Sequence, residues 1–260
     1  MLLFQTVPST LIVSMRLDVY LTENGICLSR TEAKNFITSG AVTVDGRTVT
    51  KPSFSVEGDA SVTVDKSAKR YFSRGGLKLE AALDAFGVSP NGKNCLDIGA
   101  SSGGFTDCLL KRGAKAVVAV DSGSGQLVSA LKDDPRVVSI EGFNARYMTK
   151  NDIPLAPDIA VMDVSFISAT YIIPAITEVL PSGADFICLI KPQFEVGKAM
   201  IGKGGIVRSE AHRTSAVDKV VLFAESQGLD FLGVITSPIT GGDGNVEYLA
   251  HFRMGKADKK

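Results

Sequence analysis

Apolar residues follow a repeating pattern over the last two thirds of this 260-residue chain. Short apolar runs alternate with segments in which apolar residues recur every three or four positions, which indicates strands alternating with helices. The expected strands are residues 94–100, 116–122, 136–142, 158–166, 185–194, 231–238 and 245–254. The expected helices are residues 77–87, 105–113, 126–134, 168–180 and 212–228. This order predicts a doubly wound α/β fold with a mostly parallel sheet and an antiparallel last strand.

A smaller unit with a different pattern precedes this region. Two helical segments are followed by alternating residues on either side of Asp45-Gly46, a pair typical of a two-residue hairpin turn, and then by a short strand. The sequence therefore predicts an α+β domain at residues 15–65, a polar and basic linker at 66–76 and the α/β domain at 77–254. Residues 1–14 are interpreted as an extension ahead of Met15.

Charge, cysteine content and hydrophobicity limit which partners, metals and cellular locations we expect. The chain carries 28 Lys and Arg against 28 Asp and Glu, so binding to nucleic acid would depend on a local basic patch rather than on net charge. The four cysteines lie far apart without a metal-binding spacing, so we expect reduced thiols and no metal. No apolar run reaches the roughly 20 residues of a membrane helix. We therefore expect a cytoplasmic protein without a membrane partner, and we expect His212 and His251 near its surface.

The stretch from Asp97 to Phe105, DIGASSGGF, places small residues between an apolar strand and a helix. Small residues let the backbone approach a ligand while the first N–H groups of the helix point towards it. The spacing D-x-G-x-x-x-G differs from the GxGxxG of dinucleotide-binding proteins and from the GK[ST] of a phosphate-binding loop. Asp121, at the end of the next strand, can accept hydrogen bonds from ribose hydroxyls. The turn favours S-adenosylmethionine over a nicotinamide cofactor, with a structural turn that binds no ligand as the remaining alternative.

Residues at other strand ends indicate which group would accept a methyl group. The sequence DVSF, which begins at Asp163, lacks the two prolines of enzymes that methylate amino groups, and no cysteine follows a proline as in carbon-methylating enzymes. A hydroxyl acceptor must lose a proton, and a lysine accepts it only where burial or neighbouring cations lower its pKa. Lys191 ends a very apolar strand, and Lys78, Asp163 and Glu247 could meet it at the carboxyl edge of the sheet. The alternatives are an exposed helix lysine at Lys78, a helix cap at Asp163 and a surface strand residue at Glu247.

Five motifs, RGGLKL, DIGASSGGFTD, VMDVSFIS, IKPQFE and GGDGNVEYLAHF, together resemble the TlyA (haemolysin A) family of ribosomal-RNA 2′-O-methyltransferases. The resemblance runs from about Met15 to Phe252. It implies an FtsJ-like, Rossmann-like class I S-adenosylmethionine-dependent methyltransferase domain preceded by an S4-type RNA-binding domain. It also implies a catalytic tetrad of Lys78, Asp163, Lys191 and Glu247. The predicted S-adenosylmethionine-binding residues are Asp97, Gly99, Ala100, Ser101, Gly103, Gly104, Phe105, Asp121 and Asn144.

The same resemblance implies a cytidine of ribosomal RNA, within ribosomal subunits or particles, as the substrate. Lys191 is then the candidate general base for the ribose 2′-hydroxyl, Asp163 positions it, and Glu247 holds Lys78 or the ribose. Phosphate contacts are expected from Arg16, Arg30, Lys34, Arg47 and Arg74.

The glycine-rich basic loop at 195–208 is a candidate lid, and Phe166 and Phe194 could stack on the target base, although packing in the core is commoner for phenylalanine. A membrane-active haemolysin and a catalytically inactive RNA-binding protein are the alternative functions.

Overall fold

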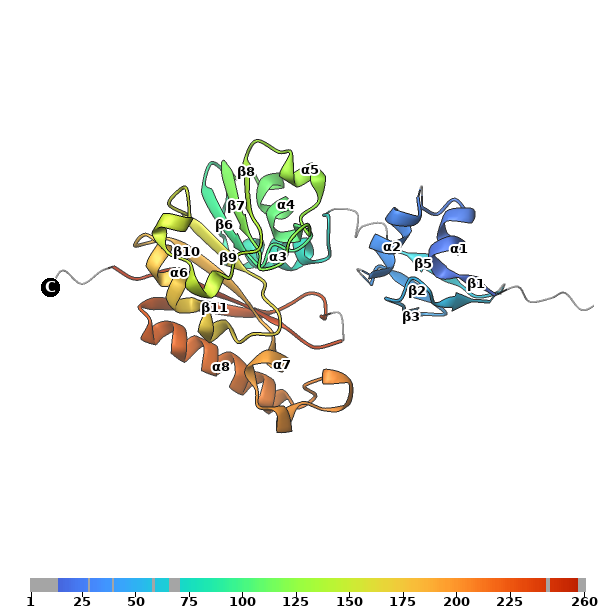
Figure 1. The fold of residues 1–260 in the computed structure, drawn as a ribbon. Helices are drawn as coiled ribbons and strands as arrows, with labels where there is room; N and C mark the ends of the chain where they lie inside the picture. The colour runs from blue at the N-terminus through green and yellow to red at the C-terminus, as the bar shows by residue number, and fades with distance from the viewer. Residues whose placement is uncertain are drawn as a thin grey trace, which may run out of the picture. The chain divides into compact units, whose positions relative to one another are not determined.

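A computed structural model describes residues 14–27, 29–38, 40–57, 59–65, 71–241 and 244–256, except for the side chains at 31, 32 and 35. The chain divides into two compact units, Met1–Lys69 and Arg70–Lys260 (Figure 1). Each unit has hydrophobic clusters of its own, and each is described by itself. Residues 1–13 of the expected extension and residues 66–70 of the expected linker lie outside the described residues.

The first unit combines two helices with two small antiparallel sheets. Its elements are β1 (Met15–Arg16), α1 (Leu17–Glu23), α2 (Arg30–Thr38), β2 (Val42–Val44), β3 (Arg47–Thr48), β4 (Ser55–Val56) and β5 (Val62–Val64). β2 pairs with both β3 and β5, and β1 pairs with β4. Asp45 and Gly46 have positive φ angles of 49° and 74°, as the expected two-residue hairpin turn requires. The β1–β4 pair is additional to the expected elements, because strands of two residues are too short to leave a sequence pattern.

A buried carboxylate organises two basic residues of this unit. Asp18, in the first turn of α1, has a fully buried side chain and accepts hydrogen bonds from the guanidinium groups of Arg16 at 2.9 Å and Arg30 at 2.8 Å. The hydrogen bond from Arg16, supported by Arg30, lowers the pKa of Asp18 to about 2 against the opposing effect of burial. Both arginines remain about half exposed, so the contacts that satisfy Asp18 also hold two predicted RNA-binding side chains at the surface.

The second unit is built on a seven-stranded sheet of order β11-β12-β10-β9-β6-β7-β8. β6 to β10 pair in parallel, whereas β12 is antiparallel to both β10 and β11. The expected mostly parallel sheet with an antiparallel last strand is confirmed, and that last strand lies inside the sheet. The strands are β6 (Asn94–Ile98), β7 (Ala116–Val120), β8 (Val137–Ile140), β9 (Ile159–Met162), β10 (Asp185–Ile190), β11 (Leu229–Thr236) and β12 (Tyr248–Met254).

Helices cover both faces of this sheet (Figure 1). Apolar side chains of α3 (Gly75–Phe86), α4 (Gly104–Lys111) and α5 (Ser129–Lys132) pack on one face. Those of α6 (Ile173–Val179) and α8 (Glu210–Ser226) pack on the other. Because both faces are covered, β9 and β10 are buried along their whole length, which explains why they are apolar apart from Asp185 at the start of β10. Short helical turns complete the unit: η2 (Ala145–Tyr147), η3 (Lys150–Asp152), η4 (Ala169–Tyr171), α7 (Pro192–Glu195), η5 (Lys198–Met200) and η6 (Lys203–Gly205).

The direction of β12 determines which residues meet at one edge of the sheet. The carboxyl ends of β6, β7, β9 and β10 lie at the same edge as the amino end of β12, because β12 runs the opposite way. Asp163 and Lys191 directly follow β9 and β10, and Glu247 directly precedes β12. The expected strands that end or begin at this edge were therefore too long. Here the chain leaves the hydrogen-bonded sheet, and the side chains that follow or precede the strands turn towards one another.

The expected surface position of His251 is wrong. His251 is 4% exposed, because it belongs to β12 and β12 is an interior strand of the sheet. Its Nε2 atom lies 3.0 Å from Oδ1 of Asp185 on the neighbouring β10, and the same oxygen accepts hydrogen bonds from Arg253. His251 thus belongs to a buried polar cluster at the edge of the sheet opposite Lys191.

The Asp18 cluster predicts how the first unit responds to acid. The pKa of Asp18 in the folded protein, about 2, lies below the value of about 3.9 for an unfolded chain, so its contribution to stability is complete above pH 4 and is lost as the pH falls towards 2. We expect Asp18→Asn to lower the unfolding temperature of this unit at pH 7 and to make no difference near pH 2. Calorimetry across this pH range measures the effect, with the exposed Asp59→Asn as control. An unchanged transition for Asp18→Asn at pH 7 would contradict it.

Candidate active site

The turn after β6 brings the backbones of two strand ends into contact. Gly99 has a φ angle of +83°, and a Cβ atom there would lie 2.3 Å from the carbonyl oxygen of Asp163. At Gly103, where φ is +99°, a Cβ atom would lie 2.1 Å from the side chain of Leu131. Both positions therefore require glycine for reasons internal to the chain, and α4 begins directly after the turn.

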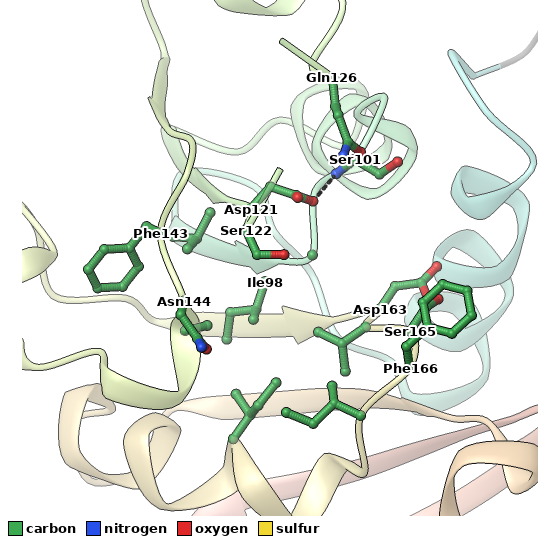
Figure 2. Close-up of a pocket in the computed structure, with 16 residues that line it drawn as sticks. Ile98, Ser101, Asp121, Ser122, Gln126, Phe143, Asn144, Asp163, Ser165 and Phe166 are labelled. Atoms are coloured by element: carbon green, nitrogen blue, oxygen red, sulfur yellow. Dashed lines mark hydrogen bonds between the residues drawn. The ribbon is translucent and has the colours of Figure 1, made fainter. Parts of the chain in front are cut away.

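Asp121 orients this turn from the end of β7. One carboxylate oxygen accepts a hydrogen bond from the N–H of Ser101 at 2.8 Å (Figure 2). The other accepts one from the N–H of Gly123 at 2.7 Å. These two bonds fix the plane of the carboxylate. Each oxygen keeps a further lone pair, so Asp121 can still accept hydrogen bonds from the hydroxyl groups of a ligand.

A cavity of about 470 Å³ opens beside the turn, within the size range of pockets that hold small molecules. Its polar groups come from the ends of different strands. Asn144 lies on one side of it, Asp163 and Ser165 lie on the other, and Asp121 lies above (Figure 2). Apolar side chains such as Phe143 form part of the wall between these polar groups. The cavity can therefore hold a ligand with a flat apolar part and several hydrogen-bonding groups.

The predicted cofactor-binding residues divide into two groups. Gly99, Ser101, Asp121 and Asn144 line the cavity. The others are buried in or beneath the turn and do not line it: Asp97, Ala100, Gly103, Gly104 and Phe105. Gly104 illustrates their structural role, because a Cβ atom there would lie 2.0 Å from Oγ of Ser73, in the segment before α3. Contact between the second group and a ligand stays a prediction.

Asp97 lies fully buried below the turn. The hydroxyl of Thr106 donates a hydrogen bond to its Oδ2 atom at 2.6 Å, and its Oδ1 atom has no hydrogen-bond partner among the described residues. Burial raises the pKa of Asp97 to about 7, because the interior solvates a carboxylate poorly and the hydrogen bond from Thr106 offsets only part of this effect. A positively charged ligand group nearby would favour the ionised form.

Two ion pairs bring together the four residues of the predicted tetrad, each residue from a different segment of the chain. Lys191 Nζ lies 2.6 Å from Oδ1 of Asp163 and donates a hydrogen bond to Oγ of Ser165 at 2.7 Å. Lys78, on α3, donates a hydrogen bond to Glu247 at 2.5 Å. Lys78 and Glu247 are both buried, so the alternatives of an exposed lysine and a surface glutamate are wrong. Asp163 and Ser165 line the cavity, and Lys191 contacts both of them without being a lining residue itself.

The candidate lid is attached to the same edge of the sheet. Residues 197–208 form an irregular loop whose base is held by Asn245, a residue that is only 1% exposed. Asn245 Oδ1 accepts a hydrogen bond from the N–H of Val207, and Nδ2 donates one to the carbonyl of Gly205, both at 2.9 Å. Asn245 lies two residues before Glu247, so the loop and the Lys78–Glu247 pair share one anchoring segment.

An exposed aromatic ring stands at the rim of the cavity. Phe166 is 92% exposed and has a φ angle of +65°, which is strained for a bulky side chain. Its ring contacts that of Phe194, with the ring centroids 5.3 Å apart. Core packing is therefore the wrong interpretation of Phe166, and its strained backbone indicates that the surrounding chain holds it in this position.

Several residues of the cavity wall were not among the predicted site residues. Phe143 adjoins Asn144, and Ser165 lies within DVSF, so sequence proximity was the available signal for both. Gln126 also lines the cavity, but it does not adjoin a predicted site residue or a motif in the sequence. Its loop follows a course set by Glu141, whose carboxylate accepts the N–H groups of residues 125–127, and only the folded chain shows this contact.

The predicted RNA-binding residues fall in both units. Lys34 and Arg47 are exposed in the first unit, as are the guanidinium groups of Arg16 and Arg30. Arg74 belongs to the second unit, where it donates a hydrogen bond to the carbonyl of Thr240 at 3.0 Å. Two further basic residues of the expected linker, at 69 and 70, lie outside the described residues.

Comparison with known families agrees with this arrangement. Residues 71–254 match the FtsJ-like methyltransferase family, and residues 15–62 match the S4 domain. The chain belongs to the FtsJ-like methyltransferase family. The match covers the glycine turn, the cavity and both ion pairs.

Relatives of this FtsJ-like methyltransferase extend over both units. The "16S/23S rRNA (cytidine-2'-O)-methyltransferase TlyA" of Mycobacterium tuberculosis is 43% identical over 92% of this chain and 89% of that protein. "Hemolysin A" of Brachyspira hyodysenteriae is 45% identical over 92% of this chain and 99% of that protein. A solved structure of a Streptococcus thermophilus protein shares 40% identity with a TM-score of 0.75, covering 95% of this chain and 90% of that one. The resemblance to the TlyA family and the methyltransferase fold are confirmed.

Among the residues that the structure describes, this FtsJ-like methyltransferase has no helix long and apolar enough to cross a membrane.

The burial of Asp97 predicts a pH dependence of stability. Its pKa is about 7 in the folded protein and about 3.9 in an unfolded chain, so the folded state binds the proton more tightly and loses stability as the pH rises from 4 to 7. We expect Asp97→Asn to gain stability relative to the unsubstituted protein over this interval, by at most about 4 kcal/mol. Urea unfolding at pH 5 and pH 8 measures this. An equal difference between the two proteins at both pH values would contradict it.

Proposed function

We propose that this FtsJ-like methyltransferase uses S-adenosylmethionine to methylate the 2′-hydroxyl of a cytidine ribose in ribosomal RNA. The observation that carries the proposal is the Lys191–Asp163 ion pair at the wall of the cavity beside the glycine turn. The relative from Mycobacterium tuberculosis, whose name states this reaction, supports it. The S4 match at residues 15–62 supports an RNA substrate, and we place the protein in the cytoplasm, where ribosomal subunits are its substrates.

The residues around the cavity fit S-adenosylmethionine. Asp121 offers two carboxylate oxygens with spare acceptor capacity to the ribose hydroxyls of the cofactor. Phe143 offers an apolar surface suited to the adenine ring. Asp97 lies beneath the turn and does not line the cavity, and its oxygen without a partner among the described residues would favour the ammonium group of the methionine part nearby. When bound, S-adenosylmethionine supplies an electrophilic methyl group on a sulfonium sulfur.

Lys191 is assigned as the group that receives the proton of the 2′-hydroxyl. Asp163 and Ser165 hold its Nζ atom, so the position of the amine is set before the substrate arrives. A general base must lie within hydrogen-bond reach of the proton that it removes, and we propose that the bound 2′-hydroxyl comes within this reach of Lys191 beside Asp163 and Ser165. Most of the rate enhancement comes from holding both reactants in one site. Glu247 holds Lys78, and this buried pair shapes the edge of the site.

RNA is held by basic groups of both units and by an aromatic group of the methyltransferase domain. Arg16, Arg30, Lys34 and Arg47 of the S4 domain contact phosphates, which positions the RNA without reading its sequence. Arg74 and the loop at 197–208 add basic groups from the methyltransferase domain. Phe166, exposed at the rim of the cavity, provides a stacking surface for the base of the acceptor nucleotide.

Substitution of Lys191 tests the assigned base. We expect Lys191→Ala to reduce methyl transfer at least about 100-fold, because the proton acceptor is lost. Binding of S-adenosylmethionine should be retained. Transfer of tritiated methyl groups to 30S, 50S and 70S particles, followed by mapping of the product, measures the first effect, and calorimetric titration measures the second. Lys115→Ala, an exposed lysine before β7, is the control. Robust turnover by folded Lys191→Ala would remove Lys191 from this role.

Substitution of Asp121 tests the cofactor site separately from the chemistry. We expect Asp121→Ala to weaken S-adenosylmethionine binding by about 10-fold or more, because hydrogen bonds to a charged acceptor are lost. Asp121→Asn keeps one acceptor oxygen and should give an intermediate affinity. Asp133→Ala removes an exposed carboxylate at the end of α5 and serves as control. Unchanged affinity of Asp121→Ala would place the ribose hydroxyls elsewhere.

A further inference from the structure

We infer that Glu195 is a positioning residue for methyl transfer, because its buried carboxylate holds the turn that carries Lys191 against the turn that carries Asp163. The inference rests on the proposed function, since it concerns the same site. We call residues 163–169, which follow β9, the β9 turn, and residues 191–195, which follow β10, the β10 turn.

Contacts join the two turns at successive points along their length. Next to the cavity, Lys191 binds Asp163 and Ser165. Further along, the rings of Phe194 and Phe166 are in contact. Phe166 is exposed, and Lys191 and Asp163 are partly exposed, so both of these contacts remain open in part to solvent.

The last contact is buried and charged. Glu195 Oε1 accepts a hydrogen bond from the N–H of Ala169 at 2.7 Å, and Oε2 accepts one from the hydroxyl of Ser168 at 2.5 Å. The Glu195 side chain is only 2% exposed, and Lys219 of α8 approaches Oε2 at 3.2 Å from the outside. Lys219 also donates a hydrogen bond to the carbonyl of Glu195 at 2.9 Å. A buried carboxylate with these charge-assisted bonds resists displacement more than the two outer contacts do.

Neither turn can hold its own conformation. α7 within the β10 turn has four residues, and a single helical turn is unstable without tertiary contacts. The β9 turn contains Phe166 with its strained positive φ angle, a conformation that persists only where the surroundings enforce it. Glu195 ends α7 and binds the start of η4, where the β9 turn finishes. It therefore closes both turns with one side chain.

Glu195 does not line the cavity, so its effect on the reaction passes through Lys191 and Asp163. Without the carboxylate, the N–H of Ala169 and the hydroxyl of Ser168 lose a buried partner and the two turns are free to separate. A shift of about 1 Å between reacting groups reduces a reaction rate by about 100-fold. The cofactor side of the cavity, around Asp121, is built by other residues and should keep its affinity.

The test compares variants of the full chain in single-turnover methyl transfer to ribosomal particles at saturating S-adenosylmethionine. We expect Glu195→Ala to slow transfer by about 100-fold with unchanged cofactor affinity. Glu195→Gln should recover most of the rate, because its amide can accept from Ala169 and donate to Ser168. Lys219→Met should stay within about threefold, since it removes the outer, half-exposed ion pair and the hydrogen bond to the carbonyl of Glu195 but leaves the bonds from Ala169 and Ser168 in place.

A core variant of matched stability tests whether Glu195 contributes only to the stability of the protein. Leu229→Ala removes a buried side chain of β11 that does not belong to either turn. If Glu195 served only stability, Leu229→Ala with a comparable fall in melting temperature would lose as much activity as Glu195→Ala. That result, or a normal rate in Glu195→Ala, or a cofactor affinity that falls as much as the rate, would overturn the inference.

Hydrogen exchange separates this inference from the proposed function. In Glu195→Gln and Glu195→Ala, amide exchange should increase at residues 163–171 and stay unchanged around Asp121. The increase should be larger in the alanine variant than in the glutamine variant. Unchanged protection at 163–171 overturns the role of Glu195 whether or not RNA is methylated. Absence of methyl transfer by the unsubstituted protein, with the exchange pattern as expected, would reject the ribosomal RNA substrate and leave the positioning role in place.

Discussion

The reversed direction of β12 is the constraint on which the active site depends. Parallel strands bring Asp163 and Lys191 to the carboxyl edge of the sheet, and β12, which runs against its neighbours, brings Glu247 to that edge from its amino end. A strand of seven residues is about 20 Å long, so a parallel β12 would place Glu247 at the far edge, beyond the reach of Lys78. One strand direction therefore decides whether the two ion pairs can share a site.

The buried charged groups at this edge of the sheet differ in whether the chain supplies a partner of opposite charge. Lys78 and Glu247 are buried as a pair, and removal of either partner would leave an uncompensated charge, which is strongly destabilising. Asp97 is buried with Thr106 as its hydrogen-bond partner and no cation bound to it among the described residues, and burial raises its pKa to about 7. The site thus contains one complete internal pair and one carboxylate for which the proposed cofactor would provide the missing positive charge.

The geometry of the candidate catalytic pair depends on contacts that lie outside the cavity. Gly99 lets the turn after β6 touch the backbone of Asp163, and Glu195 holds the other end of the β9 turn. Between these two anchors lie Ser165, which binds Lys191, and Phe166, which is exposed and strained. Buried backbone and carboxylate contacts therefore supply the rigidity that the partly exposed Lys191–Asp163 pair does not have by itself.

Sequence alone determined the two-unit organisation, the seven strands and the glycine turn, because each depends on local periodicity or on spacing along the chain. The tetrad was predicted from the resemblance to the TlyA family. The sequence did not decide between Lys78 and the ribose as the partner of Glu247, although the resemblance already paired Asp163 with Lys191, and it contained no indication of Glu195 as a link between two turns. It also placed His251 at the surface, where strand order puts it in the interior. Only the tertiary structure decided these features, because pairing and burial depend on which strands become neighbours, and residues as distant in sequence as Lys78 and Glu247 meet only when the sheet is complete.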